Sequence, residues 1–282
     1  MRCPYLKEGR AQFCHAAPVR KLILDGPADA SAGRCASPHY RECEWADPQA
    51  STHDRCPLLE QVRVQYCAAS PVTKLVPFSD AQTSSCTSSS YRYCDSYLSL
   101  AQSQSTAARA AALFYAPNHF WLDPEESGLC HIGLDSFLAE TVGSVEAITF
   151  ATERGTVCPV VVLTVHGVEW PISFPNPLMI QKVNGRVRSD PARLTADPYG
   201  SGWLFEGWEL PDRTRTGLIT GMQAATWQGG EADRLAREVR EMRGLACDGG
   251  VPVRGVAGLL PRQQLVCLFQ HFFARRAWAV EE

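Results

Sequence analysis

Lysine is scarce in this chain of 282 residues. Of the 27 basic residues, the only lysines are Lys7, Lys21, Lys74 and Lys182. The formal net charge is −3 and the sequence pI is near 6.2, so the chain lacks the excess of positive charge that is typical of nucleic-acid-binding proteins. No run of about 18 apolar residues is present either, which predicts no membrane span. We therefore expect neither nucleic acid nor a membrane as a partner.

The first residues do not resemble a secretory signal, because they contain no apolar segment and no small-residue cleavage site. This favours the cytoplasm, where thiols normally stay reduced. The chain nevertheless contains 12 cysteines, which therefore need an explanation other than disulfides. Eight of them precede residue 95, at Cys3, Cys14, Cys35, Cys43, Cys56, Cys67, Cys86 and Cys94. The other four are placed singly, at Cys130, Cys158, Cys247 and Cys267.

The eight N-terminal cysteines form two sets of four with nearly equal spacing. The first set follows C-x10-C-x20-C-x7-C and the second follows C-x10-C-x18-C-x7-C. Neighbouring residues repeat as well: Gln12-Phe13-Cys14, for example, recurs 53 residues later as Gln65-Tyr66-Cys67. Self-similarity of this kind indicates a duplicated structural unit. We expect the first repeat at residues 1–50 and the second at residues 51–96.

Each repeat has few large apolar residues, and units this small usually need a metal, a disulfide or a partner surface in order to fold. Four thiolates can close a tetrahedral zinc site or hold an iron–sulfur cluster. A closed site of this kind is structural rather than catalytic. The sequence therefore predicts zinc, or an iron–sulfur cluster, at the two four-cysteine sets. Disulfides and buried thiols without a metal remain the alternatives.

The pattern changes after the repeats. Residues 97–113 are rich in Ser, Gln and Ala and predict a linker helix. From residue 114 to 212, short apolar segments alternate with turn residues, which indicates an all-β domain. The clearest of these segments are Val145–Phe150, Pro159–Val165 and Leu178–Val183.

Several motifs of this β region resemble one family. They are Asn118-His119-Phe120-Trp121-Leu122, then Ile132-Gly133-Leu134-Asp135-Ser136-Phe137-Leu138, then Asp190-Pro191-Ala192-Arg193-Leu194, and finally Asp197-Pro198-Tyr199-Gly200-Ser201-Gly202-Trp203-Leu204. In this order they resemble the H protein of the glycine cleavage system, a relative of lipoyl domains. The last motif also reads as a turn whose Gly200 permits positive φ.

The resemblance implies a flattened, barrel-like β-sandwich with a lipoyl-lysine at the tip of one hairpin. In that family, the lipoyl group shuttles an aminomethyl group and electrons between partner enzymes. Here the modified position falls on Gly167, within Val165-His166-Gly167-Val168-Glu169. Lipoylation forms an amide on a primary amine, which Gly167 lacks, and Lys182 lies on a predicted strand. We therefore expect a diverged family member without lipoate.

Residues 213–282 predict a helical C-terminal extension. One helical stripe contains Ala232, Leu235, Ala236, Val239 and Met242, and a second contains Leu265, Leu268, Phe269, Phe272 and Phe273. Cys267 lies near the second stripe, so we expect it to be buried. Stripes of this kind pack on a core or dock a partner.

The expected fold is α+β and multidomain, with a central all-β lipoyl-like, H-protein-like domain between the cysteine-rich repeats and the helical extension. No Ser/His/Asp order, glycine-rich phosphate loop or carboxylate pair indicates an enzyme, and we assign no catalytic residue. We predict a non-catalytic adaptor or scaffold with metal-stabilised repeats that binds protein partners. The alternatives are an iron–sulfur electron-transfer protein and a carrier component related to the glycine cleavage system.

Overall fold

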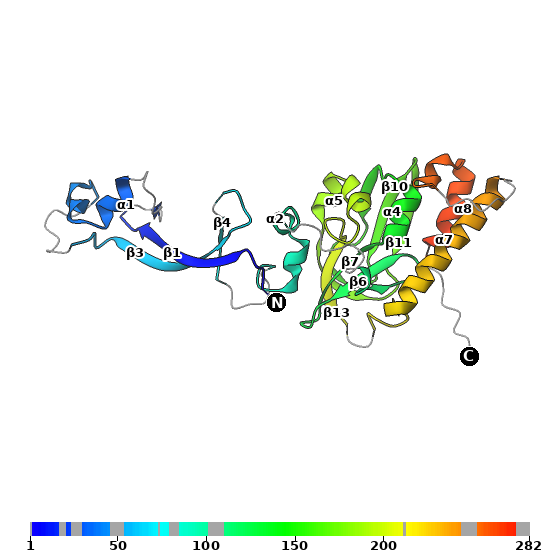
Figure 1. The fold of residues 1–282 in the computed structure, drawn as a ribbon, viewed down its shortest axis with the longest axis horizontal. Coiled ribbons are helices and arrows are strands. Elements are labelled where there is room, and N and C mark those ends of the chain that lie inside the picture. Colours follow the sequence, from blue (N-terminus) through cyan, green and yellow to red (C-terminus); the bar gives the residue numbers. More distant parts are fainter. Residues whose placement is uncertain are drawn as a thin grey trace. The chain divides into compact units, whose positions relative to one another are not determined.

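The computed structural model divides the chain into two compact units, Met1–Tyr91 (unit 1) and Arg92–Glu282 (unit 2) (Figure 1). The residues that it describes are 2–16, 21–23, 30–45, 54–72, 74–78, 85–100, 110–210, 213–243 and 253–274. Within these ranges, no helix combines the length and the apolar character needed to cross a membrane.

Unit 1 is built on a long antiparallel ribbon of two strands, β1 (Leu6–Cys14) and β3 (Leu59–Cys67). A short strand joins each outer edge, so the strand order is β2-β1-β3-β4. Figure 1 shows α1 and β4 near opposite ends of the ribbon. The shorter elements are β2 (Lys21–Ile23), α1 (Ala30–Cys35), the 3-10 helix η1 (Pro38–Glu42), β4 (Lys74–Val76) and the 3-10 helix η2 (Ser89–Tyr93), which contains the unit boundary.

The register of the ribbon gives unit 1 an approximate two-fold symmetry. β1 and β3 pair over their full nine residues, with Arg10 opposite Arg63 at the centre. Arg63 is also the repeat counterpart of Arg10, 53 residues later. β2 and β4 join the two outer edges in matching register. The duplicated sequence thus folds as two equivalent hairpins joined edge to edge.

Unit 2 contains two antiparallel sheets whose buried side chains meet in one apolar core. The smaller sheet has the order β11-β10-β8, and the larger has the order β14-β5-β6-β7-β13-β12-β9. The strands are β5 (Phe114–Tyr115), β6 (Phe120–Pro124), β7 (Leu129–Leu134), β8 (Ala147–Phe150), β9 (Gly155–Val157), β10 (Val160–Val165), β11 (Val168–Ser173), β12 (Leu178–Val183), β13 (Phe205–Glu209) and β14 (Ile219–Thr220). Strands β8, β10 and β12 confirm the three apolar segments that the sequence predicts as strands, and the α+β class is confirmed as well.

Helices cover this core, and the two long ones lie in the C-terminal extension. The helices are α2 (Asp95–Leu98), α4 (Ser136–Val142), α5 (Gly185–Ser189), α6 (Ala192–Ala196), α7 (Gly221–Arg243), the 3-10 helix η3 (Val256–Leu259) and α8 (Arg262–Phe272). Helices α7 and α8 confirm the two helical segments predicted after residue 213, although Ala232 is exposed and Phe273 follows the last residue of α8. The ring of Trp170 in β11 packs on Phe269 of α8 and on Phe273, with ring centroids 5.5 and 5.3 Å apart.

Two sequence predictions differ from the structure, and a third lies mostly outside the described residues. Cys267 is exposed rather than buried, because it lies on α8 beside the apolar stripe and not within it. Gly200 does not adopt positive φ; a Cβ there would lie 2.1 Å from Asp197 Oδ2, so the turn needs glycine for close approach. The linker helix predicted over residues 97–113 falls mostly on 101–109, which lie outside the described residues.

Candidate functional site

The hairpin of β10 and β11 carries Gly167 at its tip, the position that the family resemblance assigns to the lipoyl-lysine. Val165 pairs with Val168, so His166 and Gly167 form a two-residue turn. Both have positive φ, 47° and 70°, as two-residue hairpin turns often require. Both are exposed. The hairpin is therefore present, but its tip residue has no side chain and hence no amine.

The C-terminal extension contacts this tip. The backbone C=O of Gly167 accepts a hydrogen bond from the Arg262 guanidinium at 3.3 Å. The His166 ring lies so close to Gly258 that a Cβ on Gly258 would be 2.8 Å from two ring atoms. From the other side, the Gly167 N–H donates to the Glu146 carboxylate at 3.2 Å. Sequence reasoning missed this contact, because residues more than 90 positions apart in the sequence meet here without a local signal.

Lys182, the lysine of the β region, lies elsewhere. It occupies β12 in the larger sheet and is exposed. Its Nζ lies 5.4 Å from the centroid of the Trp203 ring, a cation–π contact. A lysine on a strand does not reproduce the hairpin-tip geometry of a lipoyl site.

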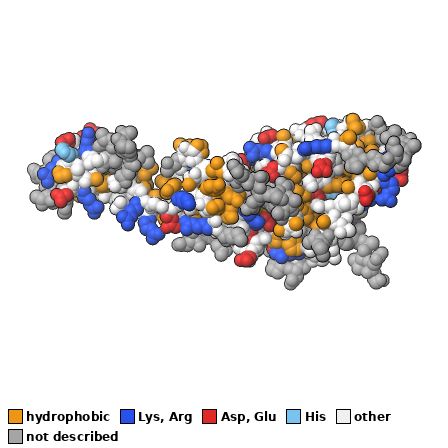
Figure 2. Space-filling view, in the orientation of Figure 1, with side chains coloured by type: hydrophobic (Ala, Val, Ile, Leu, Met, Phe, Trp, Pro, Cys, Tyr) orange, Lys and Arg blue, Asp and Glu red, His pale blue; other side chains and the backbone are white. Residues whose placement is uncertain are grey.

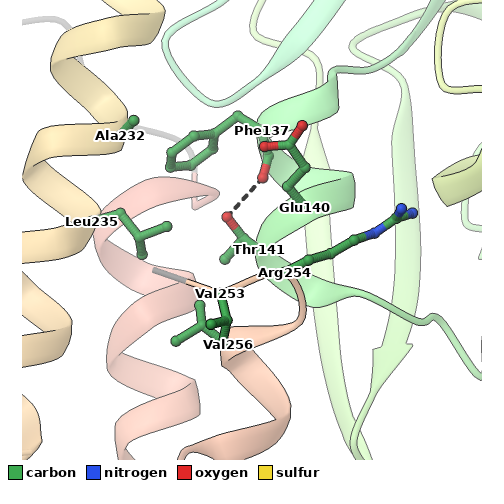
Figure 3. Close-up of a pocket in the computed structure, with 8 residues that line it drawn as sticks. All are labelled: Phe137, Glu140, Thr141, Ala232, Leu235, Val253, Arg254 and Val256. Carbon is green, nitrogen blue, oxygen red and sulfur yellow. Dashed lines mark hydrogen bonds between the residues drawn. The ribbon is translucent and has the colours of Figure 1, made fainter. Parts of the chain in front are cut away.

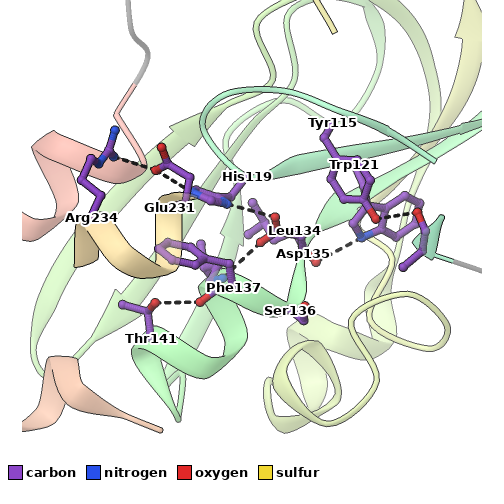
Figure 4. A network of polar contacts seen from close by, with 12 residues as sticks. Tyr115, His119, Trp121, Leu134, Asp135, Ser136, Phe137, Thr141, Glu231 and Arg234 are labelled. Carbon is purple, nitrogen blue, oxygen red and sulfur yellow. Dashed lines mark hydrogen bonds and ion pairs between the residues drawn. The ribbon is translucent and has the colours of Figure 1, made fainter. Parts of the chain in front are cut away.

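A buried polar network links the start of the β region to α7 (Figure 4). His119 is fully buried, with Nδ1 2.9 Å from Asp135 Oδ2 and Nε2 3.6 Å from Glu231 Oε2. Glu231 also pairs with Arg234 at 2.8 Å. Burial lowers the pKa of His119, but the two carboxylates outweigh burial and raise that pKa above its usual value. His119 is closed to solvent, and its contact with Glu231 ties the segment before β6 to α7.

A cavity of about 340 Å³ lies between α4, α7 and the segment leading into η3 (Figure 3). Its lining is mostly apolar and consists of Phe137, Glu140, Thr141, Ala232, Leu235, Val253, Arg254 and Val256. The Thr141 hydroxyl donates to the Phe137 carbonyl, and the Arg254 guanidinium donates to the Thr195 carbonyl. These polar groups are already engaged in the fold, and the lining contains no Ser, Cys or His nucleophile.

The positions of the eight predicted metal-ligating cysteines correct the prediction that the four cysteines of one repeat bind the same ion. Cys3 precedes β1 and Cys14 ends it, and nine extended residues span about 30 Å. Two sulfur atoms on one zinc ion lie within about 4.6 Å of each other, given Zn–S bonds of about 2.3 Å. Cys3 and Cys14 therefore cannot share an ion, and β3 separates Cys56 from Cys67 in the same way. The sequence missed this because spacing alone does not show that the intervening residues form one extended strand.

Backbone contacts join cysteines of different repeats instead. The Cys56 N–H donates to the Cys35 C=O at 2.8 Å, and the Cys3 N–H donates to the Cys86 C=O at 2.9 Å. Cys3 and Cys56 are buried, and the other six N-terminal cysteines, Cys14, Cys35, Cys43, Cys67, Cys86 and Cys94, are partly buried. Cys94 belongs to unit 2. In the described part of the chain, no three or more His, Cys, Asp or Glu side chains are already arranged around a metal position.

Charged side chains of both signs are interspersed among the described residues on the face shown in Figure 2. Ion pairs illustrate this mixing: Glu8 pairs with Arg2 and Arg63 in unit 1, and Glu209 pairs with Arg215 in unit 2.

Comparison with known proteins identifies the β region. Residues 113–225 match the family model of the glycine cleavage H-protein. The glycine cleavage system H protein of Coxiella burnetii (strain Dugway 5J108-111) is 26% identical over 98 residues, which are 34% of this chain and 75% of that protein. The glycine cleavage system H protein 5 of Aquifex aeolicus is 27% identical over 134 residues, or 46% of this chain and 85% of that protein.

A crystal structure of a glycine cleavage system H protein from Mycobacterium marinum is also similar, with 23% identity and a TM-score of 0.37. It covers 43% of this chain and 97% of that one. The family-model match and the two relatives show that this chain contains a glycine cleavage H-protein-like domain, as its motifs predicted.

Proposed function

We propose that this protein is a non-catalytic, H-protein-like adaptor or scaffold that is not lipoylated. The observation that carries the proposal is Gly167 at the tip of the β10–β11 hairpin, where the family resemblance places the modified lysine. Lipoate is attached through an amide to a primary amine, and neither Gly167 nor His166 supplies one. The contact of Arg262 with the tip supports the same conclusion, because the extension already uses this surface.

We further propose that zinc stabilises the N-terminal repeats and that the protein acts in the cytoplasm. Thiolates are soft ligands suited to zinc, and they stay reduced in that compartment. Protein partners follow from the H-protein-like domain: the relatives are named as parts of the glycine cleavage system. We infer that the domain binds a component of that system, or a related enzyme, without carrying its substrate.

Lipoylation is tested by incubating the full chain with lipoate, ATP and a lipoate ligase and measuring its intact mass. An authentic H protein is the positive control, and the Gly167→Lys variant restores an amine at the tip. The wild-type chain is expected to gain no lipoyl mass under conditions that modify the control completely. A lipoyl increment on Lys182 or any other residue of the wild type would support the carrier alternative and overturn the proposal.

Partner binding is tested by titrating the chain against purified glycine cleavage enzymes. Saturable binding without transfer of an aminomethyl group supports an adaptor. Metal analysis of anaerobically purified protein addresses the remaining alternative: zinc without visible absorbance supports a structural role. Iron with a visible band that bleaches on reduction would instead support electron transfer.

A further inference from the structure

We propose that unit 1 holds a soft metal ion in a four-cysteine site that is shared between the two repeats: Cys14, Cys35 and Cys43 come from the first repeat and Cys56 comes from the second. The inference rests on the metal binding proposed above and specifies which residues share one ion. It replaces the grouping by sequence order, which β1 and β3 make geometrically impossible.

The ribbon brings the first and the fourth ligand together. Antiparallel pairing places Cys14, the last residue of β1, opposite Leu59, the first residue of β3. One step beyond the ribbon, the His15 N–H donates to the Leu58 C=O at 3.0 Å. The chain turns tightly just before β3, because the Leu59 N–H donates to the Cys56 C=O at 3.1 Å. Cys56 is thus held at the end of the ribbon where Cys14 lies.

The segment between the hairpins supplies the other two ligands. Cys35 ends α1, and its C=O accepts the Cys56 N–H at 2.8 Å, so the backbones of these two residues are in direct contact. Cys43 follows η1, and its N–H donates to the C=O of Tyr40, whose side chain is almost fully buried. The buried tyrosine fixes the 3-10 turn, and the turn fixes Cys43.

The thiols of Cys56, Cys14 and Cys43 lie close enough to the Cys35 thiol to interact with it electrostatically. Thiolates at close range repel one another, and a divalent cation between them removes that repulsion. Cys14 shows a further feature of thiolate ligands, since its Sγ accepts a hydrogen bond from the Ala16 N–H at 3.4 Å.

Metal binding still requires the side chains to turn. Among the described residues, no such group is already arranged around a metal position. The backbone positions of the four cysteines are set by strand register, the α1 end and the 3-10 turn, so the remaining change is one of side-chain rotamers. A preformed site rarely exists in an unfolded chain, so binding of the ion is coupled to the folding of the unit that holds it.

The two-fold symmetry of unit 1 predicts that cysteines of both repeats also come together at the other end of the ribbon. There, Cys3 contacts Cys86 through its backbone N–H, and the Ala68 N–H donates to the Tyr5 C=O beside Cys67. Cys3 is therefore grouped with cysteines of the second repeat, as Cys56 is with those of the first.

The test identifies the ligands of each ion on the unmodified full chain. Cadmium-113 replaces zinc under reducing conditions, and proton–cadmium correlation NMR links each ion to the cysteine β-protons that it binds. One ion is expected to correlate with Cys14, Cys35, Cys43 and Cys56. An ion that correlates with both Cys3 and Cys14 would overturn the grouping while metal binding stands. A chain that binds no cadmium and no zinc would overturn both the grouping and the metal part of the proposed function.

A matched pair of variants provides an independent readout. With zinc present, alkylation followed by mass spectrometry reports which thiols the metal protects. In Cys56→Ser, the proposal expects Cys14, Cys35 and Cys43 to react at least about tenfold faster than in the wild type. In the control Cys3→Ser, the same three thiols stay protected. The reverse pattern, with Cys3→Ser exposing them and Cys56→Ser not, overturns the proposal.

Discussion

The two units of this protein are stabilised in different ways. In unit 2, buried side chains of two sheets and two long helices meet in one core, and Trp121 and Trp170 are fully buried. In the described part of unit 1, the buried apolar side chains are only Cys3, Leu6, Tyr40 and Cys56. Two of these four are cysteines. Hydrophobic burial can therefore account for the stability of unit 2, whereas the described residues of unit 1 bury few apolar side chains, and a bound metal is the proposed additional source of stability there.

Removal of the metal is expected to have the largest effect, because it should destabilise unit 1 and leave the stability of unit 2 unchanged. Structural zinc contributes about 10–16 kcal/mol of apparent binding energy in small zinc domains. We expect a strong chelator under reducing conditions to expose residues 1–91 to protease while the thermal transition of unit 2 stays unchanged. Limited proteolysis with mass spectrometry and calorimetry measure the two effects.

Readdition of zinc, with magnesium as the control cation, should restore protection of unit 1. If chelation left unit 1 protected, or if both units unfolded together, the contrast between a metal-held unit and a core-held unit would be wrong.

Truncation of a core side chain is expected to destabilise unit 2 and to leave metal binding by unit 1 unchanged. Trp170 is fully buried against Phe269 and Phe273, and Trp170→Ala should lower the free energy of unfolding of unit 2 by about 3–5 kcal/mol. Met179→Ala, at an exposed position, should cost well under about 1 kcal/mol. Urea unfolding measures both, and the zinc content should be the same in both variants. A loss of zinc in Trp170→Ala would show that the units are not independent.

The buried network in unit 2 should make stability depend on pH. His119→Gln removes one partner of a buried charged pair and should cost about 3 kcal/mol near pH 6. Because the pKa of His119 is raised in the folded state, its charged form stabilises the fold fully below the unfolded value of 6.5. This contribution is lost as the pH rises through the raised pKa. Urea unfolding at a series of pH values from about 6 upward should show the difference between wild type and variant shrinking as the pH rises; a difference that grew with pH would contradict a charged His119.

The smallest effect is expected at the hairpin tip. Arg262→Ala removes one exposed hydrogen bond to the Gly167 carbonyl and should cost about 0.5 kcal/mol or less. The amides of the tip should nevertheless exchange with solvent faster, as amide hydrogen exchange can measure. Arg237→Ala, at an exposed position of α7, is the control. Equal exchange at the tip in both variants would show that the extension does not hold this surface.

Local patterns made much of unit 2 predictable. The apolar run of β10 and the apolar stripes of α7 and α8 are read from neighbouring residues, and the motif from Asp197 to Leu204 carried the resemblance to the H-protein family. Cys267 was placed wrongly because a residue that flanks a helical stripe can face either way. Gly200 was predicted to be a turn residue for the wrong physical reason, since its space is taken by the Asp197 carboxylate.

Features that depend on distant contacts were not predictable. The proposed grouping of the cysteines rests on β1 pairing with β3, and no spacing within one repeat encodes the partner strand. The contact of Gly258 and Arg262 with the hairpin tip likewise joins segments far apart in the chain. The missing lysine, in contrast, was evident at once, because lipoylation chemistry requires an amine at one position.

The central pairing of Arg10 with Arg63 has a consequence for how the chain could arise and change. Because these residues occupy the same place in the two repeats, one repeat expressed alone would expose the edge of its long strand to a second copy in the same register. The N-terminal unit is thus organised like a symmetric homodimer whose subunits have been fused in tandem. Deleting either repeat would therefore create a self-associating half rather than a smaller stable module.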